Sequence, residues 1–255
     1  MRRMTRWVAV TLFVVTPGCA AHYATPGRGA NLNEIVAQAP AATQGGDPSI
    51  IHALGTEPLA HFPTGVAVVR IQAPGYESET ARGWGTGRYS IVTTRDIESP
   101  ADLERLNKLP KVSAIGPINR LLLPSQLQSD LELREAAARM HADVLLVYTL
   151  DTTFLVEDKA APLTVVTLGL SPNQQAKVVC TASALLMDTR NGFLYGVAEA
   201  TDKQDQLASA WTSGAAVDQA RRRTEGKAFA KLVGELEKTW GGVVENYAKG
   251  DPRRG

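Results

Sequence analysis

The stretch that decides the fold runs from Leu127 to Leu150 and reads LQSDLELREAAARMHADVLLVYTL. Residues 127–140 are rich in alanine and leucine, which predicts a helix. Residues 144–150 begin with five apolar residues in succession, which predicts a strand covered on both faces at the centre of a sheet. The stretch therefore predicts a helix that leads directly into a central strand. Two capping boxes are candidates for the start of the helix: Ser125 with Gln128, and Ser129 with Glu132.

Further elements lie before this unit. Residues 66–71 (VAVVRI) predict a strand, and residues 88–94 (RYSIVTT) predict a second strand that pairs with it as a hairpin. Residues 99–109 predict a helix, because Ser99 is suited to cap it and a proline follows at the first helical position. Residues 112–124 predict an extended strand that is interrupted at a Gly-Pro pair.

The C-terminal half predicts three more strands and one long helix. The strands are residues 163–170, 176–187 and 193–201, with an Asn-Gly turn between the last two. Residues 215–248 predict the helix, because large apolar residues recur there at spacings of three and four and so form one stripe. The stripe consists of Phe229, Leu232, Leu236, Trp240, Val243 and Tyr247.

Together these elements predict an α/β fold: a mixed β-sheet with packed helices and a long C-terminal helix. We expect a single domain over residues 65–250, because one domain of about 200 residues accounts for the length. Residues 19–64 predict a tether and an irregular N-terminal segment, because they are rich in glycine, proline and small polar residues. Residues 1–18 predict a lipoprotein signal peptide, for the following reasons.

The first residues have the layout of a secretory signal. Three arginines in MRRMTR precede the apolar run Trp7–Val15, and small residues follow it. The apolar run is about half of the roughly 20 residues that a membrane-spanning helix needs. We therefore expect this segment to direct export and to be removed.

The signal ends at Thr16-Pro17-Gly18-Cys19, which resembles a bacterial lipobox, in which small residues precede a cysteine that becomes lipidated. The lipobox pattern has Leu three positions before the cysteine, where this chain has Thr16. We expect acyl chains such as palmitate on Cys19 to hold the chain to a membrane. The alternative is ordinary secretion with Cys19 as a free thiol. Ala20 resembles the signal for the outer membrane, with the domain facing the periplasm; the inner membrane is the alternative.

Charge and cysteine content exclude several classes of protein. The formal net charge of the chain is +1, and it becomes −2 once Arg2, Arg3 and Arg6 are removed with the signal. A chain so close to neutral has no strong field for nucleic acid, and we expect no nucleic-acid partner. With Cys19 acylated, Cys180 is the one remaining cysteine. No intrachain disulfide can then form, and we expect a buried, unreactive thiol.

A group of envelope proteins shows a similar order of elements: helix, strand ADVLLVYTLDT, a hairpin with the turn MDTRNGFLYG, and a long helix. The chain thus resembles the curli-secretion lipoprotein CsgG, the penicillin-binding-protein activator LpoB and the TolB amino-terminal domain. In that group an Ala-Asp pair begins an apolar strand and a D-x-x-x-G turn closes a hairpin. The matching positions are Ala142-Asp143 and Asp188 to Gly192. The resemblance covers residues 65–248 and implies an α/β module that works through protein contacts, with no catalytic residues.

Residues suited to catalysis or metal binding are scattered along the chain. Asp151 follows the central strand at its carboxyl end, where ligands often bind in α/β sheets, although a solvated strand end is the simpler interpretation. Residues 83–87 (GWGTG) lack the Lys-Ser/Thr of a phosphate-binding loop. We therefore expect no catalytic residue, no metal and no cofactor. The four histidines, which lack the short spacing of a zinc site, are His22, His52, His61 and His141.

Two features are candidates for binding a protein partner. Trp84 lies between two glycines in a polar loop, where it can anchor a partner or fold back over the edge of the sheet. Arg221, Arg222 and Arg223 are expected to place three charges on the surface of the long helix. They form either a solvated face or a contact with an acidic partner or lipid headgroups.

Three functions compete. The one we favour is a non-enzymatic, membrane-anchored envelope lipoprotein that acts as an interaction or assembly module. The second is a subunit of a secretion pore resembling the curli exporter, which requires residues 163–201 to alternate apolar and polar and to protrude from the soluble sheet. The third is an envelope hydrolase built on Asp151 and a distant histidine, which requires a histidine within hydrogen-bond reach of that carboxylate.

Overall fold

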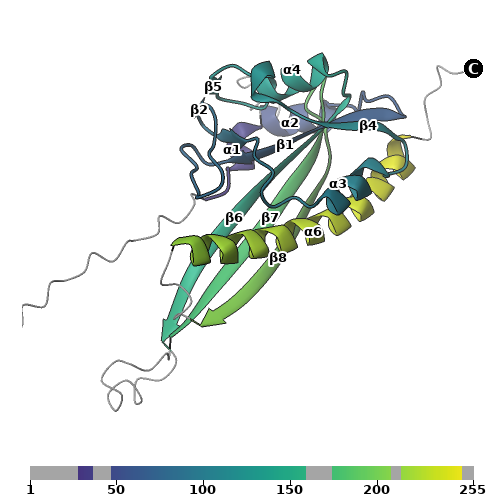
Figure 1. Cartoon of the computed structure of the whole chain (residues 1–255). Coiled ribbons are helices and arrows are strands. Elements are labelled where there is room, and N and C mark those ends of the chain that lie inside the picture. Colours follow the sequence, from purple (N-terminus) through teal and green to yellow (C-terminus); the bar gives the residue numbers. More distant parts are fainter. Residues whose placement is uncertain (1–27, 37–46, 159–173, 208–213, 249–255) are drawn as a thin grey trace, which may run out of the picture.

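Strands from both halves of the chain form one mixed β-sheet in the computed structural model, and a long helix lies along it (Figure 1). The structure describes residues 28–36, 47–158, 174–207 and 214–248. The predicted α/β class, with its mixed sheet, packed helices and long C-terminal helix, is confirmed. The elements are α1 (Leu32–Ile35), α2 (Pro48–Gly55), β1 (Thr64–Gln72), β2 (Thr86–Gly87), β3 (Ser90–Val92), α3 (Pro100–Asn107), β4 (Val112–Pro117), the 3-10 helix η1 (Arg120–Leu122), β5 (Gln126–Leu127), α4 (Leu131–Arg139), β6 (Val144–Asp158), β7 (Gln174–Asp188), β8 (Leu194–Leu207) and α6 (Gly214–Tyr247).

The strand β6 lies in the middle of the sheet, as predicted. The order is β3-β1-β6-β7-β8, with β4 also paired to β1, while β2 and β5 pair with each other. On one side β6 runs parallel to β1, with Val66 opposite Val144, and on the other it runs antiparallel to β7. Its apolar residues alternate between two clusters: Leu146 packs on the side of α6, and Leu145 packs on the side of α4. The succession of apolar residues in β6 therefore reflects cover on both faces.

The unit from α4 to β6 forms as its sequence indicates. Of the two candidate capping boxes, the second one is present: the Ser129 N–H donates to Glu132 Oε2 at 3.0 Å, and the Ser129 hydroxyl accepts from the N–H of Leu131 at 3.2 Å. At the other end His141 has φ of 56°, and the next N–H, of Ala142, donates back to the Ala137 carbonyl at 3.0 Å. This left-handed residue ends the helix and turns the chain into β6.

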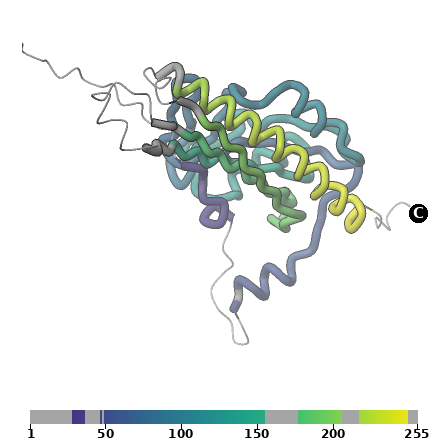
Figure 2. Tube along the Cα trace, turned by 90° about the horizontal axis from the view of Figure 1, so that it is seen from below, coloured from purple at the N-terminus to yellow at the C-terminus, as the bar shows by residue number. Residues whose placement is uncertain are grey.

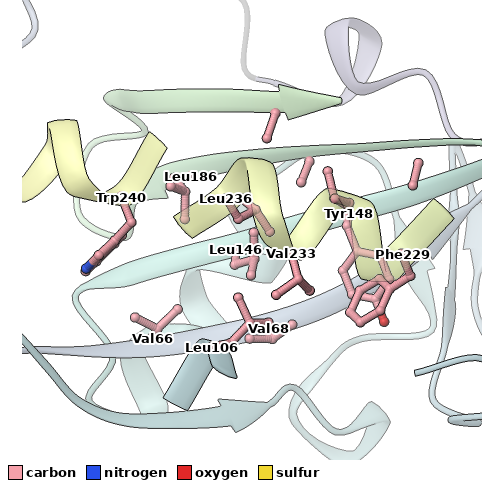
Figure 3. Packing of buried hydrophobic residues seen from close by; sticks show 14 of the residues in the cluster. Val66, Val68, Leu106, Leu146, Tyr148, Leu186, Phe229, Val233, Leu236 and Trp240 are labelled. Carbon is pink, nitrogen blue, oxygen red and sulfur yellow. The ribbon is translucent and has the colours of Figure 1, made fainter. Parts of the chain in front are cut away.

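The apolar stripe of α6 is buried against the sheet, as Figure 3 shows. Phe229, Leu236 and Trp240 are each at most 2% exposed. The Phe229 ring lies 5.1 Å from that of Tyr148 on β6, and the indole N–H of Trp240 donates to the Pro110 carbonyl at 2.8 Å. Each buried large side chain contributes about 1.5–3 kcal/mol, so α6 is held mainly by this face.

Strands β7 and β8 follow β6 in the order of the sheet, and they pair with each other from Gln175↔Leu207 to Met187↔Leu194. The predicted end of β8 at residue 201 was too early, because the polar sequence that follows still pairs with β7. Asp202 is 8% exposed there and accepts a hydrogen bond from Lys231 of α6 at 2.7 Å. The predicted strand 163–170 lies outside the described residues.

Two strand predictions were too long. The segment 88–94 forms only the short strand β3, antiparallel to β1. The segment 112–124 is extended only as far as Pro117, where β4 ends parallel to β1, and η1 follows. Proline has no N–H for the ladder, so the chain leaves the sheet at this point, after one last bond from Ile118 N–H to the Val68 carbonyl at 2.9 Å.

Part of the predicted irregular segment packs on the domain. Ala30 and Ile35 are buried, and the Ala30 N–H donates to the Thr149 hydroxyl of β6 at 2.9 Å. The strand β1 begins at Thr64, one residue before the predicted start of the domain. Within the described ranges, no helix combines the length and the apolar character needed to cross a membrane.

Candidate functional site

A hydrogen-bonded clamp fixes residues 57–61 to the end of the sheet where β6 begins. The Asp188 carboxylate accepts from the N–H of Leu59 and from the Tyr195 hydroxyl, both at 2.7 Å, and the Tyr195 oxygen accepts from the N–H of Ala60 at 3.0 Å. Burial, and next its hydrogen bond to Asp188, raises the pKa of Tyr195, so the hydroxyl stays protonated and keeps donating. We use the name 57–61 clamp for Asp143, Asp188 and Tyr195 together with the segment 57–61 that they hold.

The motif residues behind the family resemblance form this clamp. Asp143, which precedes β6, accepts from the N–H of His61 at 3.1 Å and pairs with Arg190 of the β7–β8 turn at 2.7 Å. Gly192 of that turn has φ of 78°, a conformation that glycine adopts without strain. Asp143 and Asp188, one from each motif, are about 45 residues apart in sequence. Both nevertheless accept hydrogen bonds from the same short segment, at His61 and Leu59.

Directly before the clamp, α2 stands away from the body of the protein (Figure 2). Asp47 caps it by accepting from the N–H of Ser49 at 2.9 Å, and Pro48 occupies the first helical position. Every residue from Ser49 to Gly55 is exposed. Three apolar side chains on one face of this helix form what we call the apolar ridge: Ile50, Ile51 and Leu54, which are 58%, 54% and 84% exposed.

A buried charge network joins α6 to β1 and to the loop before α3. The Arg70 guanidinium lies 3.1 Å from Asp96 and 3.6 Å from Glu225, and Arg221 lies 3.0 Å from Asp96 and 2.9 Å from Asp218. Arg221 also pairs closely with Glu225. The side chains of all five residues are at most 7% exposed, so two cations face three carboxylates away from water, and half-buried Arg222 supplies a third cation through Asp218 at 2.9 Å.

The pKa directions in this network follow from burial and pairing. Burial acts to lower the pKa of Arg70 and of Arg221, but the charge of Glu225 and further neighbours outweigh it and raise both pKa values. Burial acts to raise the pKa of Asp96, yet its hydrogen bond from Thr80 and the two arginines lower it overall. For Glu225, burial prevails over both arginines, and the pKa is raised.

A polar cavity of about 100 Å³ adjoins the network where the edge of β1 changes partner. The first residues of β1, from Thr64 to Val68, pair with β4. Its last residues, from Arg70 to Gln72, pair with β3 along the same edge. Between these two pairings the edge is open, and the cavity occupies the gap. It is lined by Val68, Val69, Arg70, Ile91, Val92, Thr93, Arg95, Glu98, Pro117, Ile118, Asn119 and Tyr148.

The floor of this cavity holds polar groups that lack partners. The Tyr148 hydroxyl donates to Glu98 Oε1, but Glu98 Oε2 and Arg70 Nε are buried with no hydrogen-bond partner. Burial, and next the charge of Glu98, raises the pKa of Tyr148 well above its ordinary value. Buried polar atoms are nearly always paired in folded proteins, so two unpaired atoms beside one cavity indicate room for a ligand or for water.

The residues predicted to bind a partner lie in different places. The expectation that Arg221 is on the helix surface was wrong: it is 0% exposed, because this position of α6 faces β1 and the buried carboxylates. Arg222 is half-buried and pairs with Asp218 at 2.9 Å, and Arg223 is exposed. Trp84 is half-buried, pairs through its backbone with Ile91, and packs against the cluster on the α4 side. Cys19 lies outside the described residues.

The residues considered for catalysis are not brought together. His61 lies 3.5 Å from Asp143, and Asp151 is exposed on β6, with no histidine paired to it in the part of the chain that the structure describes. The same ranges contain no group of three or more His, Cys, Asp or Glu able to hold a metal ion. Cys180 is buried, and burial, followed by the charge of Glu225, raises the pKa of its thiol to about 12.

Sequence reasoning missed Arg70, Glu98 and Tyr148. One signal was available: Arg70 is the single charged residue in the apolar strand VAVVRI. A charged side chain within such a strand needs a partner inside the protein. Glu98 gave no comparable signal, because it lies in the polar sequence before α3 and is buried only by tertiary packing.

No protein-family model matches this chain, and no curated protein matches it. Among solved structures, the crystal structure of a Xanthomonas campestris protein of the DUF330 family is similar, with 12% sequence identity and a TM-score of 0.34. The match covers 84% of this chain and 97% of that one. A similarity of this size implies nothing about what this chain does.

Proposed function

We propose that this chain is a non-enzymatic lipoprotein of the bacterial envelope that acts as an interaction or assembly module. Acyl chains on Cys19 hold it to the outer membrane on the periplasmic side, and α2 contacts a protein partner. The arginine-rich start, the short apolar run and the cysteine at the expected cleavage point support the anchor.

The observation that carries the contact role is the exposed apolar ridge of α2. Single apolar residues on a surface are ordinary, but neighbouring ones on one helix face are typical of an interaction site. Ile50, Ile51 and Leu54 have the spacing of one such face. The 57–61 clamp holds the chain just beyond the helix, so the ridge is presented from a fixed base.

The charge around α2 favours a protein groove over a lipid surface. No lysine or arginine occurs between Arg28 and Arg70, whereas Glu34, Asp47 and Glu57 do. Helices that lie on membranes are usually rich in lysine and arginine on their polar face. We therefore propose that the partner offers an apolar groove with basic residues at its rim, into which α2 is laid.

The course of β7 and β8 supports the interaction module over a pore subunit. Both strands belong to the main sheet, and α6 covers one face of them, while their far ends run on past β1. Their other face carries polar cross-strand pairs: the hydroxyls of Thr181 and Thr201 are 2.9 Å apart, and Ser183 donates to Glu199 at 3.0 Å. A lipid-facing strand presents its apolar face to the membrane, whereas α6 covers the apolar face of these strands.

The first experiment tests the apolar ridge in cells. A photo-cross-linking residue placed at position 54 should capture one discrete partner, while the same residue at Leu121, an equally exposed leucine on η1, should not. Changing Ile50 and Ile51 to Ser should reduce the cross-linked product at least about tenfold, because the apolar contact is lost. Unfolding free energy should change by less than about 0.5 kcal/mol per site, as expected for exposed residues.

A second arm tests the anchor separately. The Cys19→Ser variant should lose acyl labelling and leave the membrane fraction, whereas Cys180→Ser should keep both. Labelled Cys19→Ser protein would contradict the anchor. Equal capture at positions 54 and 121, or capture that survives the Ile→Ser changes, would contradict the contact role of α2 even if the anchor holds.

A further inference from the structure

Glu98 is a buried carboxyl group with one oxygen that lacks a hydrogen-bond partner, and it lies beside a network of buried charges. In the adjacent network three cations face three carboxylates: Arg70, Arg221 and the half-buried Arg222 pair with Asp96, Asp218 and Glu225. Glu98 is 8% exposed and has no ion pair among the described residues. The Tyr148 hydroxyl donates a hydrogen bond to Glu98 Oε1, whereas Glu98 Oε2 has no hydrogen-bond partner among the described residues. Keeping such a group costs stability unless something else pairs with it.

The neighbouring cavity is large enough to hold that missing partner. A cavity holds one water molecule when about 10–15 Å³ of space is open to the centre of that molecule. The cavity at Glu98 has about 100 Å³, which gives room for a ligand of several non-hydrogen atoms. It lies beside the point of β1 where pairing with β4 ends and pairing with β3 begins.

The mouth of the cavity carries exposed hydrogen-bond donors. Thr93, Arg95 and Asn119 line it and are exposed. Asn119 Oδ1 accepts from the N–H of Leu121 at 3.0 Å, which leaves its amide NH₂ as a donor. The mouth thus offers donors and one cation, which suit a carboxylate.

We propose that this cavity binds a small zwitterion of the amino-acid class, with its ammonium group on Glu98 and its carboxylate on Arg95. The ammonium supplies the N–H donor that Glu98 Oε2 lacks. The carboxylate accepts from the Arg95 guanidinium, with Thr93 and Asn119 as further donors. Both ends are then paired, and the cavity is filled.

Other ligand classes fit less well. A simple anion could accept from Arg70 Nε, but it would leave Glu98 Oε2 unpaired and lie near that carboxylate. A simple amine would leave Arg95 without a partner. A divalent metal ion prefers several oxygen ligands, and the described residues offer no cluster of three or more acidic, histidine or cysteine side chains.

The test is a titration of the detergent-solubilised full-length protein, followed by calorimetry. The probes are glycine, β-alanine and γ-aminobutyrate as zwitterions, glycylglycine as a peptide, and propylamine and propionate as single-charge controls. We expect one of the three amino acids to bind at least tenfold more tightly than either control. Tighter binding of glycylglycine than of any free amino acid would identify a peptide end as the natural source of the same chemistry.

Matched variants locate the binding. Glu98→Gln should weaken binding of the zwitterion at least tenfold, because the amide has no negative charge to pair with the ammonium group. Arg95→Gln, at the exposed mouth, should also weaken binding without changing the fold. Glu79→Gln, at an exposed glutamate, should leave the affinity unchanged. Unchanged affinity in Glu98→Gln, propionate binding as tightly as the zwitterions, or no binding by any probe would overturn the proposal.

Discussion

At the scale of single residues, the three consecutive arginines of α6 show how adjacent positions acquire different roles. Successive residues on a helix are separated by about 100° around its axis, so neighbours face different surroundings. Arg221 therefore lies inside the buried charge network, Arg222 lies at its border, and Arg223 lies in solvent. Composition alone treats the three as one basic patch.

Arg221→Met should destabilise the protein by about 3–5 kcal/mol, because Asp96, Asp218 and Glu225 would remain buried without this cation. Arg223→Met, two positions away and exposed, is the matched control and should change stability by less than about 0.5 kcal/mol. Urea unfolding of both variants at pH 7 gives the comparison. A loss below about 1 kcal/mol for Arg221→Met would mean that the network is not stabilising.

At the scale of elements, the β7–β8 turn supports more than its own hairpin. Asp188 accepts within the turn from the N–H of Arg190 at 2.8 Å, and it also accepts from Leu59 and Tyr195. One carboxylate thus sets the turn and fixes the segment that follows α2. The position of the apolar ridge depends on this contact.

Asp188→Ala should lower the unfolding free energy by about 2–4 kcal/mol, because the buried Tyr195 hydroxyl and the part-buried N–H groups of Leu59 and Arg190 lose their acceptor. It should also speed proteolytic cleavage within residues 56–62, where the chain is released from the clamp. Asp151→Ala, at an exposed aspartate of β6, is the control and should have neither effect. Mass spectrometry of brief digests distinguishes the two; unchanged cleavage in Asp188→Ala would show that another contact holds this segment.

At the scale of the whole molecule, the sheet has a supported half and an extended half. Residues 144–147 of β6 pair with both β1 and β7, and helices pack on both faces. Beyond them β6 continues to Asp158 with pairing to β7 alone, and Figure 1 shows β6, β7 and β8 running on past the rest of the sheet. Stability should therefore decrease along these strands.

Hydrogen exchange should report this gradient directly. We expect amides of residues 144–147 to exchange on the order of a hundredfold more slowly than those of residues 153–158, because they open only with the core. The measurement is native-state exchange on the full-length protein, with residues 183–187 of β7 as the supported reference. Equal protection along β6 would mean that another part of the chain or a partner covers the extended half.

The sequence by itself determined the central unit of this protein. The capping box at Ser129, the apolar run of β6 and the stripe of α6 all depend on spacing within one segment, so they could be predicted without any neighbour. The same holds for the turn at Gly192 and for the N-cap of α3 at Ser99. Strand ends were less well predicted, because pairing rather than composition extends β8 and shortens β3.

Only the tertiary structure decided which polar residues meet. Arg70 and Arg221 are about 150 residues apart in sequence, yet they share Asp96 and Glu225. The buried carboxyl group of Glu98 and the cavity beside it lie where one edge of β1 pairs first with a parallel and then with an antiparallel strand. Local patterns encode periodicity and capping, whereas burial of a charge depends on every chain segment packed around it, and no short stretch of sequence contains that information.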